Sequence, residues 1–91
     1  NVRMLANPRS LLCAILDSVR RVYLEAGIVN ADLSEFNILV DVSEDGVWRE
    51  FFLIDWPQAV RATDAGALDL LRRDVDNVLR FFRNVAIRCI A

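Results

Sequence analysis

The stretch that decides the fold is Asn30-Ala31-Asp32-Leu33-Ser34-Glu35-Phe36-Asn37. It places an aspartate and an asparagine in a connection that follows a helical pattern and precedes two runs of β-forming residues. Binding and catalytic side chains are often carried by such connections on a rigid framework. Residues 30–37 are therefore the candidate functional segment of the chain.

A helix is predicted over residues 8–26, directly before this segment. Asn7 is a favourable N-cap, and Pro8 suits the first helical position. Gly27 ends the helix, because glycine adopts the left-handed C-terminal conformation at little cost. The apolar residues of the helix recur at helical spacing: Leu12, Ile15, Val19, Val22 and Ala26.

A β-hairpin is predicted after the segment. Its strands are expected at residues 36–42 and 47–54, where β-forming residues dominate. The stretch Ser43-Glu44-Asp45-Gly46 between them has turn chemistry, and Pro57 prevents any extension of the second strand.

A second helix is predicted from Ala67 to Asn84, and residues 85–91 can extend it. Thr63 or Asp64 is the expected N-cap. Its apolar positions are Leu68, Leu71, Val75, Val78 and Phe82. The order helix, loop, hairpin, loop, helix predicts an α+β fold.

Composition excludes several classes of function. The net charge of −2 gives no general attraction to nucleic acid. No apolar run approaches the roughly 20 residues that cross a bilayer, so we expect a cytoplasmic protein without membrane contact. Cys13 and Cys89 lie far apart in a chain that has no histidine, which excludes the usual zinc sites and predicts two buried, reduced thiols.

Two absences concern nucleotide binding. All eleven basic residues are arginine, and the glycines Gly27, Gly46 and Gly66 stand apart from one another. A site that needs a phosphate-binding lysine or a glycine-rich loop cannot be complete within this chain. Because the chain begins at Asn1 without an initiator methionine, we expect it to be part of a longer protein.

The spacing of Asp32, Leu33 and Asn37 is that of a catalytic loop for phosphoryl transfer. This reaction needs a carboxylate that orients the attacking hydroxyl, as Asp32 would, and a neutral oxygen ligand for Mg²⁺, as Asn37 would. It also needs an anionic metal ligand, and Asp55 follows the apolar run that ends at Ile54. Each residue alone is better explained as a turn or strand-end residue, but the three together favour an active site.

At these residues the chain resembles the RIO family of atypical serine/threonine protein kinases. The resemblance extends from about Pro8 to Asn84. The matching motifs are Gly27-Ile28-Val29, residues 31–40, Ile54-Asp55-Trp56-Pro57-Gln58, residues 70–75 and Phe81-Phe82. It implies that residues 1–91 are part of the C-lobe of a kinase-like fold and that the ATP-binding small lobe is absent.

The resemblance also implies an activity, which is serine/threonine kinase or ATPase action with ATP and Mg²⁺ in maturation of the small ribosomal subunit. The implied partners are a protein substrate or pre-ribosomal subunit, with ribosomal RNA as a further candidate. Asp32 would be catalytic, and Asn37 and Asp55 would bind the cofactor and its metal. In some members the aspartate at the position of Asp55 is thought to be phosphorylated transiently. Without the small lobe, the fragment is expected to be inactive.

The chain departs from the family in two places. Asn30 stands where the family usually has histidine, and Asp64-Ala65-Gly66-Ala67 replaces a His-Pro-Asn-Ala segment. Two other functions stay open, the first because its catalytic loop and Ile54-Asp55-Trp56 strand end look similar, the second because of Asn30. One is a small-molecule phosphotransferase of the aminoglycoside or choline kinase kind, and the other is a catalytically dead kinase-like binding module.

Asp74 is the candidate support for the loop. In kinases a buried helical aspartate of this lobe accepts hydrogen bonds from backbone amides of the catalytic loop. We predict that Asp74 does this for residues 29–34 rather than being solvated. The neighbouring Arg72 and Arg73 are expected to be solvated, with contact to substrate or ribosomal RNA as the alternative.

Overall fold

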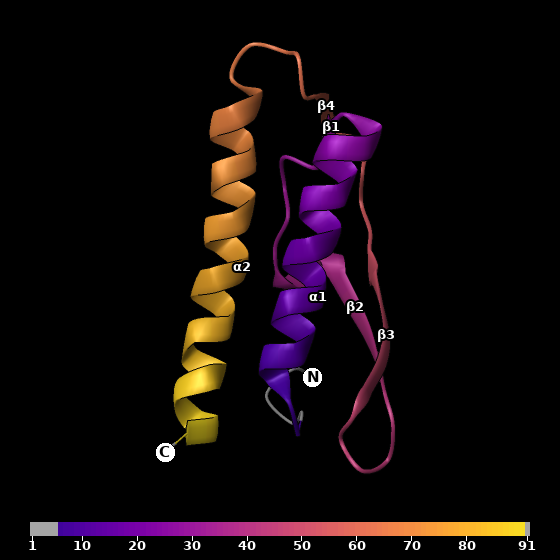
Figure 1. Ribbon diagram of the computed structural model, residues 1–91, viewed down its shortest axis with the longest axis vertical. Coiled ribbons are helices and arrows are strands. Elements are labelled where there is room, and N and C mark those ends of the chain that lie inside the picture. Colours follow the sequence, from indigo (N-terminus) through magenta and orange to yellow (C-terminus); the bar gives the residue numbers. More distant parts are fainter. Residues whose placement is uncertain (1–5, 91) are drawn as a thin grey trace.

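Two helices run antiparallel along the molecule (Figure 1). The first, α1, spans Pro8–Arg21 and continues into a π-helical turn, η2, at Val22–Ala26. Together they confirm the helix predicted over residues 8–26, although its last turn is wider than an α-helix. Asn7 caps the start, since its side chain accepts a hydrogen bond from the Ser10 N–H at 3.3 Å. Gly27 ends it in the left-handed conformation, with φ of 68°.

The second helix, α2, spans Ala67–Ile90. The computed structural model describes residues 6–90, without the side chains of Glu35 and residues 84–90. The predicted N-cap is wrong, because the helix begins after Gly66. The Asp64 carboxylate instead accepts the Arg61 N–H at 3.0 Å within the preceding turn.

The predicted hairpin is confirmed. Strand β2, Ile38–Val42, pairs antiparallel with β3, Trp48–Leu53, and a bulge lies between Asp41 and Val42. Each strand is slightly shorter than predicted. The residues before Ile38 form a short 3₁₀ helix, η3, at Glu35–Asn37.

A second pair of strands was not predicted. Strand β1, Ile28–Val29, pairs antiparallel with β4, Val60–Arg61. Strands of two residues are too short to give a periodic pattern, so pairing of distant segments alone produces them. They bring the start of the candidate segment beside the stretch that follows Asp55.

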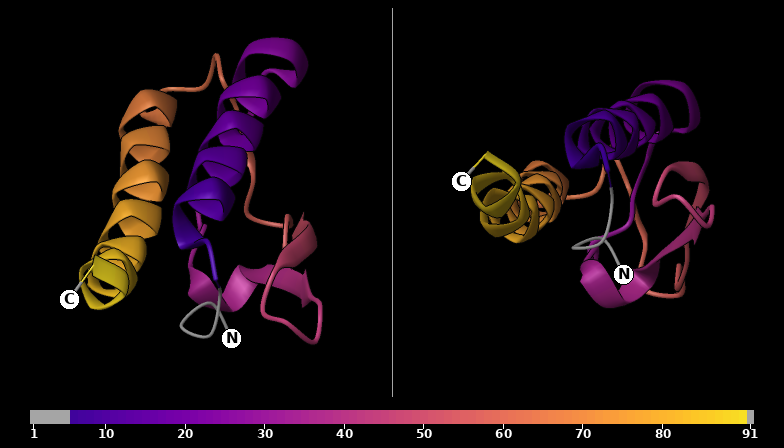
Figure 2. Two further views of the ribbon diagram at one scale, coloured as in Figure 1. Left: turned by 60° about the horizontal axis from the view of Figure 1, so that its bottom comes forward. Right: turned by 90° about the horizontal axis from the view of Figure 1, so that it is seen from below.

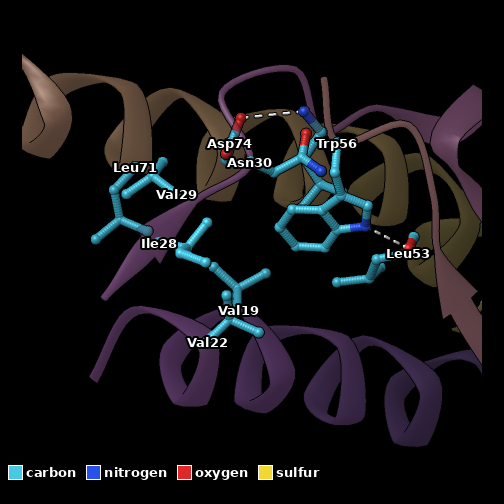
Figure 3. A pocket seen from close by; sticks show the side chains of 10 residues that line it. Val19, Val22, Ile28, Val29, Asn30, Leu53, Trp56, Leu71 and Asp74 are labelled. Atoms are coloured by element: carbon cyan, nitrogen blue, oxygen red, sulfur yellow. Dashed lines mark hydrogen bonds between the residues drawn. The ribbon is translucent and has the colours of Figure 1, made fainter. Parts of the chain in front are cut away.

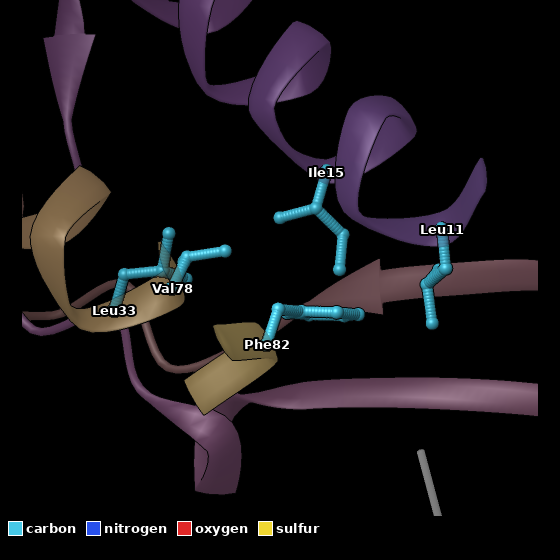
Figure 4. Packing of buried hydrophobic residues seen from close by; sticks show 5 residues of the cluster. All are labelled: Leu11, Ile15, Leu33, Val78 and Phe82. Carbon is cyan, nitrogen blue, oxygen red and sulfur yellow. The ribbon is translucent and has the colours of Figure 1, made fainter. Parts of the chain in front are cut away.

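The core lies between the two helices, the hairpin and the candidate segment. Seen along the helices, α1, α2 and the hairpin occupy different sides of the molecule (Figure 2). The buried cluster combines side chains from α1, α2 and the loop: Leu11, Ile15, Leu33, Val78 and Phe82 (Figure 4). One face of the hairpin packs against this cluster, which anchors the strands that flank the candidate segment.

Some details of the predicted core are wrong. Leu11 is fully buried although it was outside the predicted pattern, whereas Ala26 and Leu68 are exposed. Cys13 is exposed as well, which contradicts the prediction of two buried thiols; the side chain of Cys89 lies outside the described residues. These errors arise at the edges of the helical faces, where spacing alone does not decide which residue meets a neighbour.

The mixed architecture of helices and antiparallel strands confirms the predicted α+β class. Within residues 6–90, no helix is long and apolar enough to span a membrane.

Candidate active site

The backbone of the candidate segment is held by Asp74 on α2. The Asp74 side chain is 1 % exposed. Its Oδ2 accepts the Ala31 N–H at 2.8 Å, and its Oδ1 accepts the Leu33 N–H at 3.1 Å. The predicted burial and hydrogen bonds of Asp74 are therefore confirmed. Charge-assisted bonds of this kind are stronger than neutral ones, and they offset the cost of burying the carboxylate.

Two further side chains of α2 bind carbonyl groups of the same segment. Arg73 donates to the Ala31 oxygen at 2.9 Å, and Asn77 donates to the Leu33 oxygen at 3.2 Å. Arg73 is exposed, as predicted, and in addition bonds to the loop, which was not predicted. Both the N–H and the carbonyl of Ala31 are consequently held by adjacent residues of one helix.

Ala31 needs such support because its backbone is left-handed, with φ of 73°. A residue with a Cβ reaches this region at a cost of about 1 to 3 kcal/mol and stays there only when its surroundings impose it. The bonds from Arg73 and Asp74 supply that constraint. They set the direction in which the chain enters Asp32.

Asn37 joins the loop to the end of the hairpin. Its Nδ2 donates to the Asp32 carbonyl oxygen at 2.7 Å, and its own carbonyl accepts the Ile54 N–H at 2.9 Å. Ser34 caps η3 by accepting the Phe36 N–H, which turns the chain so that Asn37 can make both bonds. Asn37 therefore contacts Asp32 directly and is bonded to Ile54, the residue that precedes Asp55.

Asp55 is the second residue with a left-handed backbone, with φ of 67°. The turn around it is closed by side chains on both sides. The Trp56 indole donates to the Leu53 carbonyl at 2.8 Å, and the Gln58 amide donates to the Asp55 carbonyl at 2.5 Å. Backbone strain in non-glycine residues concentrates at functional sites, and here it falls within the candidate segment and on a predicted metal ligand.

The carboxylates of the site differ in their surroundings. Asp32 and Asp55 are exposed, while Asp74 is buried behind them. Within the described part of the chain, no group of three or more acidic, cysteine or histidine side chains is arranged to hold a metal. Two carboxylates and the amide oxygen of Asn37 are nevertheless oxygen donors of the type that Mg²⁺ prefers, with water completing its coordination.

Asn30, which stands at the family's histidine position, is 6 % exposed and lies behind Asp32. Its Oδ1 accepts the Asp32 N–H at 3.0 Å and a bond from the Gln58 amide at 3.0 Å. These two donors fix the orientation of the Asn30 amide. Its Nδ2 has no hydrogen-bond partner among the described residues.

A small cavity lies beside Asn30, and Figure 3 shows Asn30 and Trp56 on its wall together with Val19 of α1, Val22 of η2 and Ile28 of β1. Its volume of about 10 Å³ is room for one water at most. The cavity lies on the core side of the loop and is not lined by Asp32, Asn37 or Asp55. It is therefore not the space in which a nucleotide would bind.

Sequence reasoning singled out Asp32, Asn37, Asp55 and Asp74, and the structure places all four around one loop. It missed the contacts of Arg73 and Gln58. Both are long polar side chains whose targets are backbone carbonyls far away in the sequence, and only the position of Gln58 within the Ile54–Gln58 motif could have indicated its contacts.

The chain is similar to several known proteins of one kind. The family model described as RIO domain matches residues 1–91. The RIO-type serine/threonine-protein kinase Rio2 of Methanocaldococcus jannaschii is 42 % identical over 79 residues, which are 87 % of this chain and 27 % of that protein. The serine/threonine-protein kinase RIO1 of Caenorhabditis elegans is 41 % identical over 73 residues, or 80 % of this chain and 13 % of that protein.

A solved structure shows the same fold. The crystal structure of the Rio2 kinase–ADP/Mg²⁺–phosphoaspartate complex from Chaetomium thermophilum matches with a TM-score of 0.79 at 28 % identity, over 88 % of this chain and 25 % of that chain. The chain thus spans about a quarter or less of the length of these relatives. A match along the whole chain, together with identities of about 40 % over most of it, shows that this protein belongs to the RIO domain family.

Proposed function

We propose that these residues form the catalytic part of a RIO-type serine/threonine kinase or ATPase that transfers a phosphoryl group from ATP with Mg²⁺. The observation that carries the proposal is the meeting of Asp32, Asn37 and the Ile54–Asp55 backbone through direct hydrogen bonds. The reaction requires a proton acceptor and metal ligands around the same phosphate oxygens. The named relatives are protein kinases, which supports the same activity here.

Each residue has a distinct role in this proposal. Asp32 orients the attacking hydroxyl and accepts its proton. Asn37 and Asp55 hold Mg²⁺, which neutralises charge on the phosphates when it is bound. Asp74 does not touch the reacting atoms, and its role is to hold residues 31–33 in shape. The exposure of Asp32 and Asp55 leaves both carboxylates accessible to a nucleotide.

The solved relative supports the choice of cofactors, since its complex contains ADP, Mg²⁺ and a phosphoaspartate. By analogy, Asp55 is the candidate for a carboxylate that itself receives the phosphoryl group. In that step a carboxylate oxygen forms a bond to the γ-phosphorus while the bond to the ADP oxygen breaks. Water would later release phosphate, which gives net ATP hydrolysis.

The wider setting rests on the family resemblance. We propose that residues 1–91 are part of a kinase-like C-lobe and that an ATP-binding small lobe elsewhere in the complete protein supplies the phosphate-binding lysine. A protein substrate or pre-ribosomal subunit, with ribosomal RNA as a further candidate partner, and action in the cytoplasm during small-subunit maturation follow from the same resemblance. Alone, residues 1–91 are expected to be inactive.

The test uses the complete protein that carries these residues. Asp32→Asn keeps the shape of the side chain but removes the proton acceptor, and general-base catalysis contributes about 10² to 10⁴-fold. We expect kcat for phosphoryl transfer to fall within that range while the melting temperature changes little. Glu44→Gln, in the exposed hairpin turn, is the matched control and should behave like the wild type.

A binding module without catalysis is the second candidate, because the family's histidine is replaced by Asn30. The same experiment separates the two functions. A wild-type protein that neither hydrolyses ATP nor transfers phosphate, under conditions where it binds nucleotide and Mg²⁺, would support the binding module and refute the enzyme.

A further inference from the structure

The side-chain amide of Gln58 connects two segments that are far apart in the sequence. Its Nε2 lies 2.5 Å from the Asp55 carbonyl oxygen, 3.1 Å from the Asn30 carbonyl oxygen and 3.0 Å from Asn30 Oδ1. All three neighbours are oxygens, so the amide must present its NH₂ group to them. Two hydrogens serve three acceptors, which means that at least one hydrogen is shared.

This contact is part of a continuous path between two predicted site residues. Asn30 Oδ1 also accepts the backbone N–H of Asp32 at 3.0 Å. The path therefore runs from the Asp32 backbone through the Asn30 and Gln58 side chains to the Asp55 backbone. Within residues 6–90, the stretch 55–58 is hydrogen-bonded to residues 30–32 through the Gln58 side chain alone.

Asp55 has particular need of such a connection. Its left-handed backbone, with φ of 67°, is maintained only if the surrounding structure imposes it. The other hydrogen bonds of this turn are local, from the Trp56 indole to Leu53 and from the Ala59 N–H to the Trp56 carbonyl. Asn37 holds the residue before Asp55 to the loop, since its carbonyl accepts the Ile54 N–H and its Nδ2 donates to the Asp32 carbonyl. Residues 55–58 themselves are bonded to the loop through Gln58.

Resting on the proposed function, we propose that Gln58 is a positioning residue for phosphoryl transfer. Together with the Asn37 bridge, its amide sets the separation between Asp32 and Asp55, and therefore between the proton acceptor and the metal ligand. Gln58 itself does not touch the reacting atoms. A displacement of about 1 Å between reacting groups can lower a rate by about 10²-fold, so a connection between backbones is enough to affect catalysis.

The chemistry of the contact suggests two substitutions. Gln58→Met keeps the length of the side chain without charge and without donors. Gln58→Glu keeps the shape but places a carboxylate oxygen against three oxygens, which repels them. Gln58→Glu also adds a negative charge near Asp55, which favours Mg²⁺ binding. If the variants lost rate only because Mg²⁺ binds weakly, Gln58→Glu would lose less rate than Gln58→Met.

The experiment compares both variants with the wild type and with Glu44→Gln in the complete protein. We measure kcat, the KM for ATP, the Mg²⁺ concentration that gives half-maximal rate and the melting temperature. In both variants we expect kcat to fall about 10- to 100-fold, with a smaller change in the KM for ATP. Gln58→Met should also need more Mg²⁺. Glu44→Gln should match the wild type in all four quantities.

Assays are run well below the melting temperature of each variant, so that a loss of rate reports on folded protein. Amide hydrogen exchange at Asp32 and Ala59, whose N–H groups bond to Asn30 Oδ1 and the Trp56 carbonyl, provides a measurement independent of activity, and we expect faster exchange in Gln58→Met. Wild-type kcat and Mg²⁺ dependence in Gln58→Met would overturn the positioning role. A wild-type protein that shows no reaction with ATP would instead refute the proposed function, and the catalytic role of Gln58 with it.

Discussion

The carboxylate of Asp74 is buried, and its hydrogen-bond partners are backbone amides of the loop. Leaving a charged group in the interior without partners is costly, and here each carboxylate oxygen accepts one backbone N–H. The two carboxylate oxygens also supply hydrogen-bond acceptors that the loop lacks. Its amides at Ala31 and Leu33 belong to residues outside any helix or strand, so they need acceptors from elsewhere.

The first prediction concerns this residue. Asp74→Ala should lower the free energy of unfolding by about 1 to 3 kcal/mol, because the amides of Ala31 and Leu33 lose their acceptor while buried. Asp76→Ala is the matched control, since Asp76 lies on the same helix but is exposed. Urea denaturation of both variants measures the difference. Equal stability of the two variants would show that the Asp74 bonds contribute nothing net.

A second prediction at the scale of the residue concerns Asn30. Asn30→Ala removes Oδ1, which accepts the Asp32 N–H and is one of the three oxygens around the Gln58 amide. Because Asn30 is 6 % exposed, water cannot fully replace the lost acceptor, and we expect a loss of about 1 to 3 kcal/mol in unfolding free energy. Thermal denaturation checks this, and an unchanged melting temperature would contradict it.

At the scale of the element, the ends of helices and strands are where local rules and tertiary contacts compete. Asn7 and Gly27 act as the local rules predict. Asp64 does not, because its carboxylate is used by the turn at Arg61 before the helix begins. The π-helical turn at residues 22–26 and the short strands β1 and β4 have no sequence pattern of their own. The two strands result from the pairing of residues 28–29 with residues 60–61, which lie far apart in the sequence.

Gly27 gives a prediction about such an end. Nothing lies within 4 Å of a Cβ built at this position, so an added methyl meets no steric clash. The φ of 68° alone then decides the cost, and Gly27→Ala should lower the unfolding free energy by about 1 to 2 kcal/mol. Gly27→Asn should cost less, because asparagine enters the left-handed region more readily. Chemical denaturation compares the two, and a greater loss for asparagine would contradict the argument.

The hairpin turn gives a prediction about pH. The Ser43 hydroxyl, followed by the backbone N–H of Asp45, holds the pKa of the Asp45 carboxyl below its usual range. A carboxyl with a lowered pKa in the folded state contributes stability above the unfolded pKa of about 3.9, and the contribution is lost as pH falls through the folded pKa. Ser43→Ala should therefore raise the pKa of Asp45 towards the ordinary value. Titration followed by carbon NMR measures it, and an unchanged pKa would refute the role of Ser43.

At the scale of the whole molecule, the sequence predicts the order of elements and the residues of the site better than it predicts how they are connected. Asp32, Asn37 and Asp55 are recognisable because their spacing reflects a shared chemistry. The bonds of Arg73 and Gln58 are not recognisable, because they depend on tertiary distances to carbonyl groups. Helical spacing likewise identified Val78 and Phe82 but not the edge of the core, since burial there depends on the neighbouring element.

The last prediction concerns nucleotide binding by the 91 residues alone. The candidate site offers ligands for Mg²⁺ at Asn37 and Asp55, but the chain has no lysine and no glycine-rich loop. Each charged hydrogen bond that is missing from the phosphates removes about 1.5 to 3 kcal/mol, and 1.4 kcal/mol corresponds to about tenfold in Kd. We therefore expect ATP·Mg²⁺ to bind residues 1–91 at least about 100-fold more weakly than it binds the complete protein. Calorimetry on both under the same conditions gives the ratio, with Asp55→Asn in the complete protein as a variant that lacks only a metal ligand. Equal affinities would mean that these residues hold the nucleotide by themselves, and that the phosphate contacts assigned to another part of the protein do not exist.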